Sequence, residues 1–194
     1  MVDVNYLILL LERCDFMARK VDTSHIGELL HDGKMKIVEW NSRSDIWIEW
    51  QDEYKARVHT TYQHAKAGKV GNPYAKTVYG VGCLGNVDFK VVVNGKRDKR
   101  YMVWYNMIRR CYDVDYQRKY GLTEQKIVCQ RWLCFEYFLQ DLPLIENYDM
   151  WLNGEKVKFD CDIKQMYSYE EVKVYSLKTV MFVTNNMKKA LLEF

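Results

Sequence analysis

The sequence predicts an α+β protein made of a small N-terminal antiparallel β module and a larger C-terminal module of helices and strands. Alternating apolar and polar residues indicate strands between residues 26 and 59. Apolar residues three and four positions apart indicate two helices between residues 101 and 142. A final stretch, Val157–Lys189, has the pattern of strand, loop, strand and short helix. We place the boundary between the modules, 1–78 and 79–194, in the glycine-rich stretch Gly68–Gly85.

The length and composition of the chain exclude several classes of protein. The chain has 194 residues, 48% of them hydrophobic and 14% aromatic, which excludes a disordered chain. Its only strongly apolar run, Tyr6–Leu11, is too short to cross a bilayer and lacks the features of a signal peptide. Six cysteines without any C-x-x-C spacing favour free thiols over disulfides. We therefore expect a cytoplasmic protein with no membrane partner.

The N-terminal module begins with an expected helix over residues 4–20 and continues as strands. Met35–Trp40 and Asp45–Trp50 alternate in polarity and are joined by the turn-forming residues Asn41–Ser44. Alternation places Ile46, Ile48 and Trp50 on one face, and Trp47 and Glu49 on the other. Two further segments, Ile26–Leu30 and Lys55–His59, complete a small curled sheet that we expect to be SH3-like.

The middle of the chain is basic. From Phe89 to Lys119 there are nine Lys or Arg residues and three Asp residues, within an overall net charge of +3. Asn94-Gly95 predicts a hairpin between Phe89–Val93 and Lys99–Tyr101, followed by a helix to Tyr112. The expected nucleic-acid-binding residues are the basic ones of this hairpin and helix: Lys96, Arg97, Lys99, Arg100, Arg109 and Arg110. The alternative is a solvated turn, because charge runs are commonly exposed.

Further elements follow toward the C-terminus. Gln130–Leu142 has helical spacing, with Trp132, Phe135, Leu139 and Leu142 on its core side. Asn153-Gly154 predicts another hairpin, between Asp149–Leu152 and Lys156–Lys158. Lys158–Ile163 and Thr179–Val183 then form two strands, and Asn185-Asn186 caps a last helix through Leu191.

Two carboxylates in the first of these strands form the candidate site. Asp160 and Asp162 are two positions apart, so their side chains leave a strand on the same face. Together they could hold Mg²⁺ or Mn²⁺, because hard cations prefer oxygen ligands. The alternative is that the aspartates pair with Lys158 and Lys164 at the end of the strand. A strand–loop–strand–helix unit with an acidic strand end is the outline of a ββα-metal nuclease site.

Several segments resemble, in order, a group of phage-encoded HNH (ββα-metal)-like endonucleases. The resemblance covers most of residues 25–190. Its strongest parts are YMVWYNMIRRCY (101–112), VCQRWLCFEYF (128–138) and FDCD with VYSLKTVMFVTNN (159–186). It implies a divalent metal, DNA as partner, Asp160 and Asp162 as catalytic residues, and a location in the host cytoplasm. It also implies that Asn185 or Asn186, of which we choose Asn185, is a remnant of the metal ligand in the last helix, although a helix cap explains either residue.

The chain also departs from that group. Cys161 stands where the general-base histidine follows the first Asp, and all four histidines lie between His25 and His64. A thiolate is a poor substitute for imidazole in activating water. The resemblance thus implies a DNA-binding relative of these nucleases whose cleavage is weak or lost, and leaves open whether it is an enzyme. The alternative is a phage protein that uses a degenerate nuclease fold to bind and inhibit a host protein.

Overall fold

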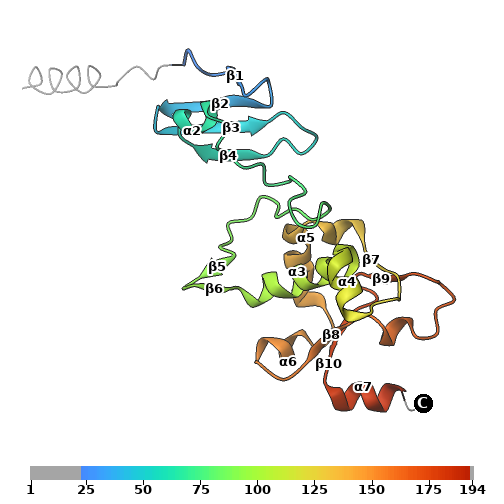
Figure 1. Ribbon diagram of the computed structural model, residues 1–194. Coiled ribbons are helices and arrows are strands. Elements are labelled where there is room, and N and C mark those ends of the chain that lie inside the picture. The colour runs from blue at the N-terminus through green and yellow to red at the C-terminus, as the bar shows by residue number, and fades with distance from the viewer. Residues whose placement is uncertain (1–22, 193–194) are drawn as a thin grey trace, which may run out of the picture. The chain divides into compact units, whose positions relative to one another are not determined.

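The computed structural model describes residues 23–192, and the helix expected over residues 4–20 lies outside them. The chain divides into two compact units, residues 1–72 and 73–194 (Figure 1). The division falls shortly before residue 78, where the sequence predicts the boundary. Helices occur together with antiparallel strands, which confirms the α+β class. None of the helices between residues 23 and 192 has the length and apolarity of a membrane span.

The first unit is a four-stranded antiparallel sheet with strand order β1-β2-β3-β4. Its elements are β1 (Leu29–Leu30), β2 (Met35–Ser42), β3 (Asp45–Trp50), β4 (Arg57–Thr60) and the short helix α2 (Tyr62–Lys66). Each strand pairs with the next one along the chain, so the sheet is built from local hairpins. All four strands were expected from the sequence, although β1 is shorter than its expected segment.

The predicted alternation of β3 decides which of its faces is buried. Ile46 and Ile48 are fully buried, whereas Trp47, on the opposite face, is 36% exposed. Ile46 and Ile48 pack with Met35, Ile37 and other apolar side chains into the core of this unit. Burial of these apolar side chains, rather than the weak strand propensity of any one residue, therefore fixes the register of the sheet.

A basic hairpin in the second unit is followed by the longest helix among the described residues of that unit. β5 (Val92–Val93) pairs with β6 (Lys96–Arg97) across Asn94 and Gly95, both with positive φ, as the Asn-Gly signal predicts. Helix α3 (Lys99–Tyr112) follows at once, because the Asp98 side chain accepts the Arg100 N–H and caps it. The strand expected at Lys99–Tyr101 is therefore wrong: it is the first turn of α3.

The core of the second unit forms around α3. The predicted stripe is buried and consists of Trp104, Met107, Ile108 and Cys111. Trp104 Nε1 donates to the carbonyl of Trp132 at 2.8 Å, so the indole is satisfied within the core. Helix α4 (Val114–Tyr120) follows and ends at Gly121, which has the left-handed conformation common after helices.

Two expectations in the following segment are wrong. The single helix expected over Gln130–Leu142 is divided into η1 (Gln130–Leu133), α5 (Phe135–Asp141) and η2 (Leu142–Leu144). It breaks at Cys134, which is extended and pairs with Cys83 in a β-bridge. The hairpin expected around Asn153-Gly154 is absent, because Tyr148–Leu152 forms helix α6. Asn153 and Gly154 still form a turn, with Gly154 at positive φ, but this turn ends α6, whose Trp151 stacks on Phe182 with ring centroids 5.3 Å apart.

The C-terminal part has the expected order of strand, strand and helix (Figure 1). β8 (Lys158–Asp160) pairs antiparallel with β10 (Met181–Val183), and α7 (Asn185–Leu192) follows. Thr184, whose hydroxyl accepts the Met187 N–H at 3.1 Å, caps α7, so the expected cap at Asn185-Asn186 is wrong by one position. Between the two strands lie η3 (Ile163–Gln165) and β9 (Lys173–Tyr175). β9 pairs in parallel with β7 (Lys126–Val128).

Candidate nucleic-acid interface

A polar cleft of about 480 Å³ lies in the second unit, between α3, the end of β8 and α7. Met107, Phe159 and Tyr175 give it an apolar lining. Its polar side chains come from separate parts of the chain and comprise Asn106, Arg110, Lys158, Asp160, Asp162 and Lys188. Both predicted aspartates and one of the six predicted basic residues, Arg110, are therefore brought together in this cleft.

Asp160 is the most buried charged group of the cleft, with 7% of its surface exposed. Its Oδ2 lies 2.6 Å from the Nζ of Lys188, and its Oδ1 accepts the backbone N–H groups of Asp162 and Ile163. Burial alone would raise the pKa of this carboxyl, but Lys188 and the two N–H groups outweigh it. The pKa therefore lies below its ordinary value of 3.8, and Asp160 is ionised at neutral pH.

Those two backbone hydrogen bonds also end the strand. The sequence predicts one strand through Ile163, with Asp160 and Asp162 on the same face. β8 instead stops at Asp160, and Asp162 has helical backbone angles at the start of η3. The strand prediction is wrong because the Asp160 side chain offers the following backbone N–H groups a local turn in place of strand pairing. The turn nevertheless leaves both aspartates lining the same cleft.

Asp162 belongs to a second charged network, which is built on the parallel pair β7–β9. The pairing places Lys126 directly opposite Lys173, and two like charges there would repel. Both ammonium groups bind Asp162 Oδ1, at 2.6 and 3.1 Å, and both also contact Glu124. Burial raises the pKa of Asp162, but the two lysines outweigh it and hold that pKa below its ordinary value. Asp162 and Glu124 thus neutralise the charges of Lys126 and Lys173 and allow these lysines to face each other.

These shifts predict that acid destabilises the second unit through this network. A carboxyl with a lowered folded-state pKa adds stability above its ordinary value of 3.8 and loses that contribution as the pH falls through the lowered value. We expect Asp162→Asn to be less stable than the parent at pH 7, and the difference to shrink by pH 3. Denaturant midpoints at the two pH values measure it. A difference that stays constant with pH would contradict the assignment.

Cys161 lies between the two aspartates, in the position where the resemblance to HNH-like nucleases leads us to expect a histidine. Its side chain is 1% exposed, and burial raises the pKa of its thiol to about 11, although a hydrogen bond with Tyr175 partly opposes this. The thiol is therefore neutral at physiological pH and cannot act as a general base toward water. All four histidines precede residue 73, so the sequence of the second unit contains no imidazole.

Two cations of the cleft are available to an external anion. Arg110 and Lys158 are both exposed, and neither forms an ion pair with a carboxylate between residues 23 and 192. Arg110 also lines an adjoining hollow of about 200 Å³, together with Thr123 and Lys126. Arg110 comes from α3 and Lys158 from β8, so the free positive charge lies on two sides of the cleft.

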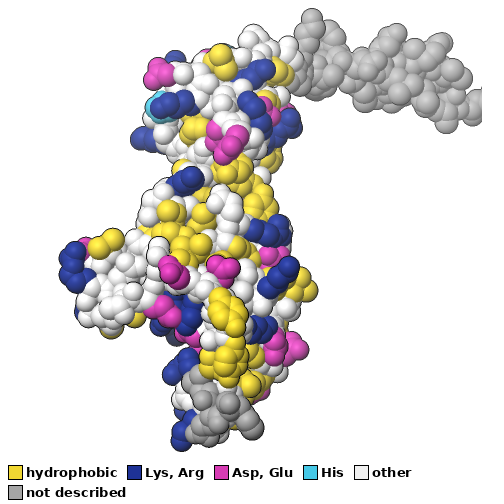
Figure 2. Space-filling model, turned by 90° about the vertical axis from the view of Figure 1, so that its right-hand side faces the viewer, with side chains coloured by type: hydrophobic (Ala, Val, Ile, Leu, Met, Phe, Trp, Pro, Cys, Tyr) yellow, Lys and Arg dark blue, Asp and Glu magenta, His cyan; other side chains and the backbone are white. Residues whose placement is uncertain are grey.

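The other predicted basic residues lie outside this cleft, and most contact neighbouring protein groups. Lys96 and Arg97 are exposed on β6, and Arg97 lies 5.6 Å from the Tyr105 ring. Lys99 donates to the carbonyl of Leu152 and lies over Trp151. Arg100 pairs with Asp98 at 2.9 Å, and Arg109 pairs with Asp113 at 3.3 Å. On the face shown in Figure 2, Lys and Arg side chains are interspersed with acidic and apolar ones.

Two of the three predicted metal ligands, Asp160 and Asp162, line the cleft. Asn185 is exposed at the start of α7 and does not line the cleft. Each aspartate already binds at least one ammonium group, which a metal ion would have to displace. Across residues 23–192, no three His, Cys, Asp or Glu side chains are grouped in a way that suits a metal.

The sequence did not point to Lys188, Lys126, Lys173 or Glu124, which hold these carboxylates. Lys188 could have been found from helical spacing, because it lies one turn after Thr184 on a helix that follows the strand paired with β8. The pairing of Lys126 with Lys173 has no such signal, since three-residue strands are too short to show alternation.

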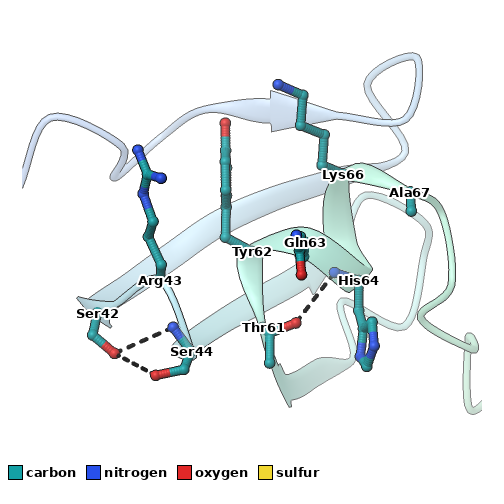
Figure 3. A pocket seen from close by; sticks show the side chains of 9 residues that line it. All are labelled: Ser42, Arg43, Ser44, Thr61, Tyr62, Gln63, His64, Lys66 and Ala67. Atoms are coloured by element: carbon teal, nitrogen blue, oxygen red, sulfur yellow. Dashed lines mark hydrogen bonds between the residues drawn. The ribbon is translucent and has the colours of Figure 1, made fainter.

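A larger hollow, of about 990 Å³, lies in the first unit between the β2–β3 turn and α2. In Figure 3, Arg43, Tyr62 and Lys66 point to the same side of this hollow. The Tyr62 hydroxyl donates to Glu28 at 3.0 Å, which fixes the ring. The hollow is open and lacks paired carboxylates, so the candidate site is the cleft of the second unit.

Comparisons of the chain with protein families, with curated proteins and with solved structures find no match.

Proposed function

We propose that this chain is a DNA-binding protein related to phage HNH-like endonucleases, in which strand cleavage is weak or lost. The observation that carries the proposal is a pair of exposed cations, Arg110 and Lys158, in one cleft of the second unit, neither of which pairs with a carboxylate in the part of the chain that the structure describes. Phosphate groups are the ligands that such cations bind in nucleic acids, and they supply most of the affinity that does not depend on sequence.

The order of elements around the cleft supports the relation to HNH-like proteins. β8 and β10 pair antiparallel and α7 follows, which is the ββα order that the sequence resemblance implies. In this proposal the second unit is a degenerate HNH-like module. The four-stranded sheet of the first unit is the SH3-like module.

Weak or absent cleavage follows from the groups that line the cleft. Hydrolysis of a phosphodiester needs a base or a metal-bound hydroxide to generate the nucleophile. The Cys161 thiol is buried and neutral at physiological pH, and both aspartates are paired with lysines. The cleft therefore offers positive charge for binding a phosphate, but no group prepared to activate water.

The test is binding of a fluorescently labelled DNA duplex by the parent protein, measured by anisotropy at increasing salt concentration. We expect the logarithm of the association constant to fall linearly with the logarithm of the salt concentration. The slope should be roughly −2 to −3 for two or three phosphate contacts. No binding at low salt would end the proposal. In that case the alternative, binding of a host protein, would gain weight. One observation already favours it: the ring of Tyr169 is fully exposed in the loop before β9.

A further inference from the structure

Lys188 occupies the position in front of Asp160 where a hard cation would bind. Its Nζ is 2.6 Å from Asp160 Oδ2, and that carboxylate is the most buried charged group of the cleft. The other carboxylate oxygen is already used by two backbone N–H groups. Asp160 therefore has its charge neutralised and its hydrogen-bonding capacity largely filled by groups of the chain itself.

The charge of the second carboxylate is neutralised in a similar way. Asp162 Oδ1 accepts from Lys126 and Lys173 together. Three ammonium groups thus face two aspartates in one region of the second unit. A divalent ion would gain two carboxylates only by releasing lysine side chains, each of which would add an uncompensated positive charge beside the ion. That repulsion makes the exchange unfavourable.

We propose that Lys188 supplies the positive charge that a divalent metal would supply in this cleft, so that the cleft binds a phosphodiester without metal. The inference that the ligand is a phosphodiester rests on the proposed function, whereas the exclusion of the metal by Lys188 does not. Arg110 and Lys158 bind the phosphate from the two sides of the cleft, and Lys188 keeps Asp160 from repelling it.

The metal part is tested by Mn²⁺ binding, followed through the electron paramagnetic resonance signal of free Mn²⁺. The parent should bind no Mn²⁺ at about 1 mM, whereas Lys188→Met should bind it with a dissociation constant of about 10⁻³ M, as expected for a site with few carboxylates. Lys189→Met is the matched control, because Lys189 is the next residue of α7 and is exposed. It should behave like the parent.

Mn²⁺ binding by the parent that is abolished by Asp160→Asn would overturn the proposal. So would a folded Lys188→Met protein that binds no Mn²⁺. Because Lys188→Met leaves the Asp160 charge buried and unpaired, its folding is checked by thermal unfolding with and without Mn²⁺.

A second variant tests the role of Lys188 even if Lys188→Met does not fold. Asp160→Asn releases Lys188 while its amide oxygen can still accept the N–H groups of Asp162 and Ile163. One additional free cation should strengthen duplex DNA binding about tenfold at about 0.1 M salt, in the presence of EDTA. Unchanged or weaker binding would contradict the role of Lys188. If no variant binds DNA at all, the proposed function fails, and the Mn²⁺ measurement still tests the exclusion of metal.

Discussion

Replacing both Arg110 and Lys158 with glutamate should weaken duplex DNA binding about a hundredfold at about 0.1 M salt. Each phosphate contact releases close to one counterion, which is worth roughly tenfold in affinity at that salt concentration, and the variant loses two contacts. The slope of the logarithm of affinity against the logarithm of salt concentration should become less negative by about two. Anisotropy titrations at several salt concentrations measure both quantities.

The matched control for this variant is the charge reversal Arg118→Glu with Lys119→Glu. Both residues are exposed on α4, in the same unit but outside the cleft. The two variants change the net charge equally, so they separate a local contact from general attraction. Equal losses of affinity in the two variants would show that the cleft is not the binding site.

Replacing Phe182 with alanine should lower the free energy of unfolding of the second unit by about 3–5 kcal/mol. The ring is fully buried and lies 5.3 Å from the rings of both Trp151 and Phe159. Its loss would leave a cavity at the junction of α6, β8 and β10. β8 carries the cleft residues Lys158 and Asp160. Denaturant unfolding followed by tryptophan fluorescence measures the change.

Leu144→Ala is the control for the cavity. Leu144 is 69% exposed at the end of η2, so its truncation should change the free energy of unfolding by no more than about 0.5 kcal/mol. A small effect of Phe182→Ala, comparable to that of the control, would mean that β10 does not hold the ββα segment together.

Most elements and the cores could be predicted from periodicity. Trp104, Met107 and Ile108 recur at helical spacing and are buried on α3, and Ile46 and Ile48 alternate with polar residues on β3. Such patterns are reliable because burial of one face decides the structure of long segments. The turn at Asn94-Gly95 is also confirmed, because residues that favour positive φ can be recognised locally, although its second strand is Lys96–Arg97 and not Lys99–Tyr101.

The site could be predicted only in part, because its geometry depends on contacts distant in sequence. Asp160 and Asp162 were found from their spacing, and they share the cleft as expected, although a turn and not a strand places them there. Their partners could not be found in the same way. Lys126 reaches Asp162 through sheet pairing, which no local pattern encodes, whereas the helical spacing of Lys188 after Thr184 offered a signal that the prediction did not use.

The parallel pair β7–β9 has a consequence for how fast each unit folds. It joins segments roughly fifty residues apart, and closing so long a loop costs entropy before the pairing contributes any stability. The sheet of the first unit needs only neighbouring hairpins. In stopped-flow refolding the first unit should therefore reach its native signal sooner, and the lysine–aspartate network should form in the slower phase.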